Sequence, residues 1–324
     1  MKARIWGDKR FHSLNHHLRQ TFGGKVVKIP LNAGFTCPNR DGTKGYGGCT
    51  FCSAAGSGEY AGTSAFNLKQ QFDQVRGLLA AKWPKASYIA YFQPFTNTYA
   101  PADRLEFIYR ETLAFPDVVG ISIASRPDCL ADDVLDLLTR LNQETYLWLE
   151  LGLQTIHEAT GQALNRGYTT AEFQDAVKRL RSRGIRTCAH VILGLPGESR
   201  EMMLQTARAL AETDIQGIKL HALHVLEGSA LAADYQAGKI RFMDRSEYVD
   251  LLIEILEILP PDMVIQRLTG DGPRQTLLGP DWSLDKGWIL NELDRRLRQR
   301  NTWQGRRYQG NRSDQDSAGF EEPV

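Results

Sequence analysis

The chain has 324 residues, of which 42% are hydrophobic and 24% are charged, and its formal net charge is +1. This is the composition of a globular protein with a sizeable core, which excludes a fibre and a chain that is disordered throughout. Near-neutral charge argues against a protein that coats nucleic acid through bulk positive charge and leaves room for a local basic patch. No apolar run approaches the roughly 20 residues that span a bilayer.

Short apolar, β-branched runs alternate along the chain with segments of helical period. The expected strands cover residues 25–31, 87–93, 118–124, 145–151, 185–194 and 215–223. The expected helices between them lie near residues 67–83, 103–114, 131–142, 170–183 and 199–212. Thr169 and Glu172 have the spacing of a capping box before the fourth of these helices. The alternation indicates parallel strands covered by helices, in either a doubly wound sheet or a partial (β/α) barrel.

The alternation of expected strands and helices becomes less regular after residue 225. A helix is expected near 246–258, an apolar run follows at 263–268, and a last helix covers 286–300. From Gly305 onward the composition is typical of a disordered tail.

Three of the five cysteines crowd one loop directly after the first expected strand: Cys37, Cys49 and Cys52. The loop is rich in glycine, which lets the backbone turn tightly enough to bring three thiolates around one centre. Structural zinc normally has four protein ligands, whereas three thiolates with an open position suit a [4Fe–4S] cluster whose fourth iron takes an exogenous ligand. The spacing alone leaves the two kinds of site equally matched.

A zinc site would need a distant fourth ligand, such as His16, His17 or Cys188. Cys129 and Cys188 lie in apolar surroundings and are expected to be buried small side chains. An odd number of cysteines, in a chain whose first residues lack the apolar stretch of a secretory signal, argues against disulfides and export. A cytoplasmic protein without a membrane partner is therefore expected.

Four passages of the chain form an ordered set. They are LNAGFTCPNRDGTKGYGGCTFCS at 31–53, SRPDCL at 125–130, LELGLQTIHEATGQALNRGYT at 149–169 and HVILGLPGES at 190–199. In this order they resemble the radical S-adenosylmethionine (SAM) superfamily, and most closely its YhcC-like subfamily, a relative of the Elp3 radical SAM domain. The common motif of the superfamily is C-x3-C-x2-C, whereas eleven residues separate Cys37 from Cys49 here. The YhcC-like and Elp3-like proteins also lengthen this gap.

The resemblance implies a [4Fe–4S] cluster on the three cysteines, with SAM chelating its free iron. One electron, from a reductant such as flavodoxin or ferredoxin, would cleave SAM to methionine and a 5′-deoxyadenosyl radical that abstracts hydrogen from a substrate. The protein would orient SAM and exclude water from the reactive intermediate. Among α/β folds, the resemblance favours a partial (β/α)6 TIM-like barrel with a small C-terminal extension.

Residues that contact SAM are carried over from the resembling families one at a time. Gln154 and Arg166 match a Gln at a G-x-Q strand end and an Arg twelve residues later in coproporphyrinogen-type radical SAM enzymes. Arg offers a planar fork for the methionine carboxylate and Gln can bond ribose hydroxyls, although such an Arg can also be a surface salt bridge. Glu150 matches the Elp3-like E-L-G-V-Q segment and would hold the SAM amino group.

Three further residues complete the predicted SAM site. His190 takes the place of an acidic residue of the relatives and would bond the ribose, unless it is a satisfied core residue. Ile192 begins ILGLPG, which resembles the segment that packs the adenine. Gln93 begins QPFTNT, where relatives carry a Gly-rich loop against the SAM amino group, although those glycines are missing here. Arg126 and Asp128 resemble the R-P-D of Elp3 and are expected to pair with each other.

Substrate contacts are expected from the later strands and the C-terminal part. The candidates are Lys219, His221, His224, Glu227, Arg267, Asp271 and Arg274. The polar side chains of IKLHALH would line the barrel lumen, unless this is a solvated edge strand. The last helix and the residues after it hold six arginines with Trp303 and Tyr308, which suits either RNA binding or a solvated amphipathic helix. Kinship with Elp3 makes tRNA the first candidate substrate.

The sequence therefore predicts an N-terminal segment (1–24), a radical SAM core barrel (25–240), a C-terminal helical extension (241–304) and a disordered tail (305–324). Three functional hypotheses follow. They are a radical SAM enzyme acting on tRNA, a radical SAM enzyme acting on a small metabolite or a protein side chain, and a non-catalytic protein that binds zinc or an Fe–S cluster. SAM cleavage excludes the third, and salt-dependent tRNA binding separates the first two.

Overall fold

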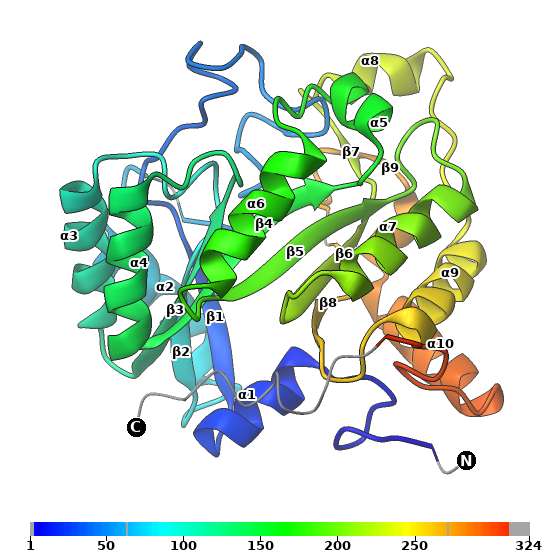
Figure 1. Ribbon diagram of the computed structural model, residues 1–324, viewed down its shortest axis with the longest axis horizontal. Helices are drawn as coiled ribbons and strands as arrows, with labels where there is room; N and C mark the ends of the chain where they lie inside the picture. Colours follow the sequence, from blue (N-terminus) through cyan, green and yellow to red (C-terminus); the bar gives the residue numbers. More distant parts are fainter. Residues whose placement is uncertain (1–2, 63, 271, 311–324) are drawn as a thin grey trace.

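The computed structural model describes residues 3–62, 64–270 and 272–310 (Figure 1). Seven parallel strands form one sheet whose order, β1-β2-β3-β4-β5-β6-β8, is the order of the chain. Their bounds are Val26–Leu31 (β1), Ser87–Phe92 (β2), Val118–Ser125 (β3), Tyr146–Gln154 (β4), Arg186–Leu193 (β5), Gly217–Ala222 (β6) and Val264–Arg267 (β8). A doubly wound sheet reverses its strand order, whereas an unreversed order with helical crossovers makes a half-barrel of the TIM type. The predicted α/β half-barrel is confirmed, with one strand more than expected.

Helices cover the outer face of the sheet, as Figure 1 shows for α3, α4, α6 and α7. The helices that connect successive strands are α2 (Leu68–Ala80), α3 (Ala102–Leu113), α4 (Asp132–Glu144), α6 (Thr170–Arg181), α7 (Arg200–Glu212) and α9 (Arg245–Ile258). The predicted capping box of α6 is present, because Glu172 N–H donates to Thr169 Oγ1 at 3.1 Å and Thr169 N–H donates to the Glu172 carboxylate at 2.6 Å. Across the described part of the chain, no helix combines the length and the apolar character needed to cross a membrane.

Short elements gather at the carboxyl ends of the strands, at the top of Figure 1. They are α5 (Glu158–Ala163), α8 (Leu231–Gln236) and the antiparallel pair of β7 (Val225–Leu226) with β9 (Leu277–Gly279). A 3-10 helix, η1 (Asp281–Leu284), follows β9. This is the edge at which barrels of the TIM type carry their chemistry.

The C-terminal part of the chain completes the barrel. Its strand β8 pairs with β6, and α9 packs against α7 and α10 (Lys286–Gln299). On α10, Arg295 and Arg296 pair with Glu292, while Arg296 and the following Arg300 pair with Asp250 of α9. These ion pairs describe an amphipathic helix with a charged face, the simpler of the two expectations for this segment.

The described part of the C-terminal tail is anchored to the fold. Gly305 N–H donates to the carbonyl of Leu256 at 3.0 Å, and Arg307 N–H donates to that of Glu257 at 2.8 Å. The prediction of disorder is therefore wrong for residues 305–308, because their backbone bonds to the last turn of α9, a tertiary contact that composition does not report. Residues 311–324 of the predicted tail lie outside the described residues.

Helix α1 (Leu14–Phe22) is missing from the sequence prediction and lies at the opposite end of the barrel, at the bottom of Figure 1. Ser13 caps it by accepting from His16 N–H at 3.2 Å, and Gly23 ends it at a φ of +68°. Leu18 is buried against an apolar cluster of strand residues that includes Trp148 and Cys188. Helix α1 therefore covers the amino end of the barrel.

Above this apolar cluster, towards the carboxyl ends of the strands, lies a layer of connected polar side chains. Each of the seven strands of the sheet contributes one of them. We call this set the polar layer, and its members are Lys28, Tyr91, Ser122, Glu150, His190, Lys219 and Gln266. Hydrogen bonds join every member to Glu150, either directly or through one of the two lysines. Strand β6 lies between β5 and β8, so its polar residues line the lumen and the edge-strand alternative is wrong.

Candidate functional site

A cavity of about 250 Å³ lies at the carboxyl ends of the strands, and four members of the polar layer line it: Tyr91, Glu150, His190 and Lys219. Its walls include eight of the nine residues that the sequence assigns to the cluster and SAM: Cys37, Cys49, Cys52, Gln93, Glu150, Gln154, His190 and Ile192. The ninth, Arg166, is not among the lining residues. The fold thus brings together side chains from one loop and from the ends of β2, β4 and β5.

The three cysteines lie on the loop between β1 and α2. Arg40 N–H donates to the Cys37 carbonyl at 2.8 Å, and Cys52 N–H donates to the Cys49 carbonyl at 3.0 Å, so the chain turns tightly after Cys37 and again between Cys49 and Cys52. Gly48 adopts a φ of +76°, which L side chains rarely do. These turns hold all three thiols on one wall of the cavity.

Cys49 and Cys52 share a hydrogen bond between their thiols. This bond, with help from the Ser57 hydroxyl and the Arg40 guanidinium, lowers the pKa of Cys52 to about 7. The same bond, together with burial, raises the pKa of Cys49 well above its ordinary value. The pair therefore holds one thiolate near neutral pH, and the thiolate is the form that binds metal.

The donor set around this loop does not suit a single metal ion. Among the residues that the structure describes, no three His, Cys, Asp or Glu side chains converge as one ion requires. Structural zinc normally takes four protein ligands, whereas a [4Fe–4S] cluster can be held by three thiolates with its fourth iron open. His16 and His17 lie on α1 at the other end of the barrel, and Cys188 lies in the apolar cluster there. Three thiols without a fourth protein ligand fit an iron–sulfur cluster.

Glu150 occupies the centre of the polar layer and is fully buried. Its Oε1 accepts from Lys28 Nζ and from Ser122 Oγ, both at 2.6 Å. Its Oε2 accepts from His190 Nε2 at 2.7 Å and from Lys219 Nζ. Four donors saturate the carboxylate, so Glu150 can accept the SAM amino group only by releasing one of them.

Burial and charge together set the protonation of this layer. Burial alone would raise the pKa of Glu150, but Lys219 and Lys28 hold it well below its ordinary value. Burial lowers the pKa of Lys219 to about 8 against the attraction of Glu150. Burial and the charge of Lys219 lower the pKa of His190 to about 4, so the imidazole is neutral at pH 7. A neutral His190 that donates from Nε2 leaves Nδ1 as an acceptor.

Gln154 ends β4 in the left-handed region, at a φ of +62°. The Tyr168 hydroxyl lies 3.0 Å from both Gln154 Oε1 and the Gly152 carbonyl. A Cβ at Gly152 would approach Gln154 Nε2 to 2.6 Å, so glycine leaves the room that this arrangement needs. A strained backbone conformation persists only where the surrounding structure stabilises it. At the cavity wall, the hydrogen bonds of the Tyr168 hydroxyl stabilise the conformation of Gln154.

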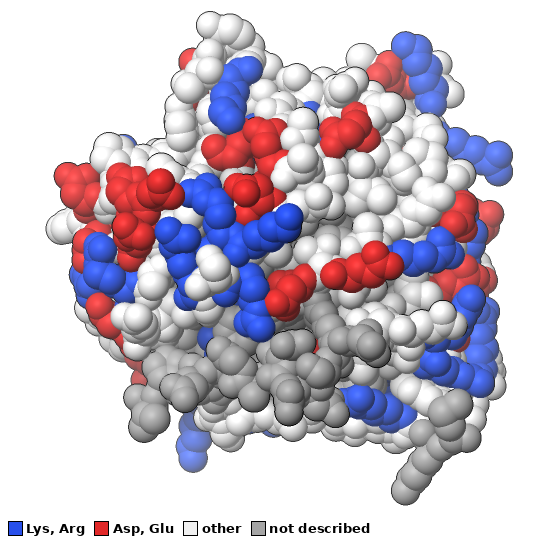
Figure 2. All heavy atoms as spheres, in the orientation of Figure 1, with Lys and Arg blue, Asp and Glu red and all other residues white. Residues whose placement is uncertain are grey.

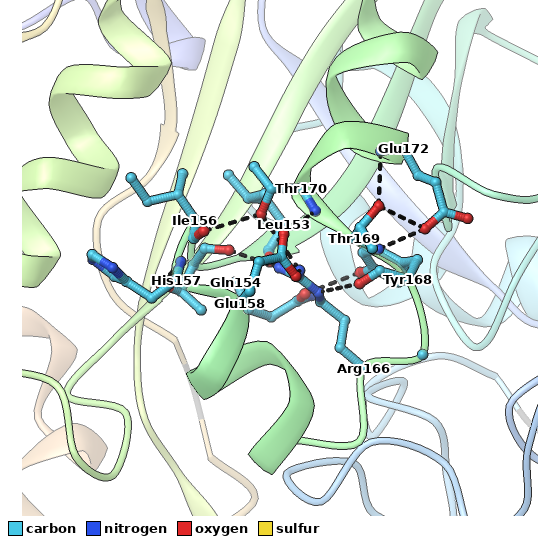
Figure 3. Close-up of polar contacts among 12 residues, drawn as sticks. Leu153, Gln154, Ile156, His157, Glu158, Arg166, Tyr168, Thr169, Thr170 and Glu172 are labelled. Atoms are coloured by element: carbon cyan, nitrogen blue, oxygen red, sulfur yellow. Dashed lines mark hydrogen bonds and ion pairs between the residues drawn. The ribbon is translucent and has the colours of Figure 1, made fainter.

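Arg166 lies behind the cavity wall, where Figure 3 shows it among the residues that follow β4. Its fully buried guanidinium donates to the carbonyls of Leu153, Thr155 and Tyr168 at 2.8, 2.7 and 2.9 Å. It also pairs with Glu158 at 3.2 Å. These contacts use its donors, so the structure does not bring Arg166 to a SAM carboxylate. The alternative of a surface salt bridge is also wrong, because the side chain is fully buried.

The loop after β2 is held by an asparagine in place of the missing glycines. Asn97 Nδ2 lies 3.2 Å from the Phe92 carbonyl and 3.0 Å from that of Pro94. Gln93 Nε2 donates to the Ser57 carbonyl at 2.8 Å, which ties this loop to the residues after the cysteines. Gln93 is thus fixed at the junction of the two loops.

Two further expectations concern residues outside the cavity floor. Arg126 and Asp128 pair as expected, through two contacts of 2.9 Å, and Lys44 adds a third at 2.6 Å. Cys188 is buried as expected, and burial raises the pKa of its thiol. Cys129 is half-buried, and burial raises its pKa to about 12, so both thiols are protonated at neutral pH.

The structure shows which of the predicted substrate-binding residues line the cavity, and it adds cavity residues that the sequence analysis did not predict. Those on the cavity wall are Lys219, His221, His224 and Arg267, whereas Glu227 and Arg274 are not, and Asp271 lies outside the described residues. Lys28 and Tyr91 were missed, although an ionisable side chain within the apolar run KVVKIPL was an available signal. Tyr168 carried no such signal, since only the fold places its hydroxyl against Gln154.

Comparison with known proteins defines the class. A family model of the Radical SAM superfamily matches residues 35–210, and a model of the Radical_SAM C-terminal domain matches residues 215–299. The first match covers more than half of the chain, and the chain belongs to the radical SAM superfamily. It is accordingly an enzyme whose cofactors are a [4Fe–4S] cluster and S-adenosylmethionine.

Individual relatives narrow the class. The chain is 50% identical to YtqA of Bacillus subtilis (strain 168) over 311 residues, 96% of each chain. It is 39% identical to YhcC of Escherichia coli (strain K12) over 281 residues, 86% of this chain and 90% of YhcC, which confirms the YhcC-like subfamily. The solved structure of N-terminally truncated Elp3 from the archaeon Methanocaldococcus infernus shares the fold, with a TM-score of 0.64 at 14% identity over 87% of this chain and 64% of that one.

Proposed function

We propose that Cys37, Cys49 and Cys52 hold the [4Fe–4S] cluster and that SAM binds in the cavity between the cysteine loop and the ends of β4 and β5. The observation that carries this proposal is convergence, because eight residues assigned from separate sequence motifs line one cavity. When bound, the two cofactors supply a 5′-deoxyadenosyl radical that takes hydrogen from a substrate. A flavodoxin or ferredoxin is the proposed source of the electron.

Three side chains of the cavity are proposed to orient SAM. Neutral His190 offers Nδ1 as an acceptor for a ribose hydroxyl while its Nε2 donates to the polar layer. The amide of Gln154, fixed by Tyr168, is suited to a second hydroxyl of the ribose. Ile192 packs against an apolar cluster formed by residues after β5 and β6, which is a wall suited to adenine.

Other predicted contacts are proposed to act as positioning residues. Glu150 keeps His190 in the tautomer that leaves Nδ1 open and compensates the charge of Lys219. Arg166 fixes the strand end that presents Gln154, through the carbonyls on either side of it. Gln93 holds the cysteine loop against the end of β2. Their effect on SAM binding would be indirect.

We propose tRNA as the substrate class, with a small metabolite or a protein side chain as the alternative. Kinship with Elp3 favours a nucleic acid. Enzymes that act on one base of a nucleic acid take that base out of its stack, so only a single nucleotide need reach the carboxyl end of the barrel. Arg295 and Arg296 of α10 lend no support, because they pair with acids of α9 and α10.

The test of the enzyme is anaerobic reconstitution with iron and sulfide, followed by reduction in the presence of SAM and chromatographic assay of 5′-deoxyadenosine. We expect the product with the natural chain and its loss in Cys37→Ala, Cys49→Ala and Cys52→Ala. Cys129→Ala is the matched control and retains the product, since this thiol is not on the cavity wall. A colourless protein that binds one zinc and leaves SAM intact would contradict the proposal.

A further inference from the structure

A second hollow, of about 790 Å³, lies between β1 and β8, the two edge strands of the half-barrel. It adjoins the cavity, since both are lined by Tyr60, Tyr91, Gln93, Lys219 and Arg267. Because the sheet does not close, this gap leads sideways from the surface to the polar layer. We call it the side groove.

The side groove is lined by a concentration of basic side chains. They are Lys25, Lys28, Lys219, Arg267, Arg274 and Lys286. No aspartate or glutamate is found among the described residues of its lining. Glu150 compensates part of the charge of Lys28 and Lys219 from the polar layer. In a chain with a net charge of +1, six cations around one hollow create a local positive potential that attracts anions.

Arg267 and Arg274 are the cations best placed to receive an anion. Neither guanidinium makes a hydrogen bond or an ion pair with any residue in the ranges 3–62, 64–270 and 272–310. Arg267 is half-buried beside the polar layer, whereas Arg274 is exposed at the outer part of the groove. A half-buried cation is stabilised by a counter-charge, and the planar fork of arginine matches the oxygens of a phosphate.

An aromatic ring stands where the side groove meets the cavity. Tyr60 is 54% exposed, and its hydroxyl donates to the Gly272 carbonyl at 3.1 Å, which fixes the ring and leaves much of it accessible. Cations along a groove with an aromatic platform are the combination by which proteins hold single-stranded nucleic acid, through phosphate contacts and base stacking.

The other basic surface in view does not offer this combination. Figure 2 shows Lys and Arg gathered over the α4 and α6 side of the molecule, with Asp and Glu directly beside them. The ion pairs there are Arg179–Asp132, Arg181–Asp214 and Arg183–Asp136. Paired charges of both signs leave little net attraction for a polyanion.

We propose that the side groove binds the phosphate backbone of an RNA substrate and that Tyr60 stacks on a base at the entrance to the cavity. This inference rests on the proposed function and adds the path by which the substrate reaches the radical site. Arg267 and Arg274 each contact a phosphate. The nucleotide that reacts passes between Tyr60 and Arg267 into the cavity.

The experiment measures binding of unmodified tRNA to the reconstituted, SAM-bound enzyme by fluorescence anisotropy between about 50 and 300 mM salt. Arg267→Gln and Arg274→Gln should each weaken binding and reduce the slope of log K against log salt by about 0.7–0.9, the amount for one lost phosphate contact. Arg241→Gln, an exposed arginine outside the groove and the cavity, is the matched control and should leave the slope unchanged. Tyr60→Ala should weaken binding without changing the slope, and Tyr60→Phe should restore it.

Three results would overturn the inference. The first is a salt slope that neither arginine variant changes. The second is binding of inorganic phosphate or a nucleoside monophosphate, dependent on Arg267, without binding of tRNA, which would identify a small phosphorylated substrate. The third is competition between SAM and tRNA for the groove, which would assign these arginines to the SAM carboxylate. The 5′-deoxyadenosine assay on the same variants keeps the two proposals apart, because product formation without tRNA binding refutes only the groove.

Discussion

Lys28, Lys219 and His190 all donate to one carboxylate, that of Glu150, and each comes from a different strand. A buried charge without partners would cost several kcal/mol, so the protonation of each of these groups depends on the others. Burial and the charge of Lys219 lower the pKa of His190 and keep its imidazole neutral beside the carboxylate. At the residue scale, the chemistry of the site therefore depends on strands that only the folded half-barrel brings together.

The pKa of His190 makes stability depend on pH. Its folded value is about 4 against an ordinary 6.5. Between these values the unfolded chain binds a proton that the folded chain does not, so stability falls as the pH falls from 6.5 towards 4. From pH 7.5 to 5.0 the natural chain should lose about 2 kcal/mol more unfolding free energy than His190→Gln, which does not titrate. Urea unfolding at the two pH values measures this, and equal losses would refute the assigned shift.

At the scale of elements, local rules account for much of what forms. The capping box of α6 and the glycine that follows α1 act as the sequence rules describe. The strand β8 appears in the sequence only as an apolar run, and its place in the sheet comes from pairing with β6. Helix α1 has only three apolar residues, Leu14, Leu18 and Phe22, too few to signal a helix before its packing partner is known.

Replacement by alanine should have opposite effects on stability at two glycines, Gly77 and Gly120. Gly77 lies exposed within α2, and a Cβ there meets nothing within 4 Å, so Gly77→Ala should raise the free energy of unfolding by about 0.5–1 kcal/mol. A Cβ at Gly120 of β3 would overlap the Tyr146 carbonyl oxygen, so Gly120→Ala should lower it by about 1–3 kcal/mol. Urea unfolding compares the two, and a change of the same sign in both would contradict the packing described between β3 and β4.

At the scale of the whole molecule, the barrel has one covered end and one functional end. Helix α1 covers the amino end over an apolar cluster, while the cavity and the side groove occupy the carboxyl end and the gap between β1 and β8. Lys28 and Gln266, 238 residues apart, bond across that gap. This hydrogen bond connects an N-terminal strand to a C-terminal strand across the open side of the sheet, next to the site.

The cover supplied by α1 can be tested with two leucines. Leu18→Ala should lower the free energy of unfolding by about 2–5 kcal/mol, because it leaves a cavity in the apolar cluster. Leu78→Ala, on α2 with 81% of its surface exposed, should change it by less than about 0.5 kcal/mol. Thermal and urea unfolding would show the difference. A small effect for Leu18 would mean that α1 does not seal the barrel.

Sequence alone determined the parallel α/β architecture and the cysteine loop, because both rest on local patterns of apolar period, turn residues and spacing. The resemblance to radical SAM proteins, carried by contiguous motifs, also predicted eight residues of the cavity wall. Tertiary structure decided that Arg166 bonds to backbone carbonyls behind the wall, that Glu150 is saturated by donors from other strands, and that distant lysines and arginines line one groove. These depend on which strands become neighbours, and hydrogen bonds between strands far apart in the chain leave no local trace in the sequence.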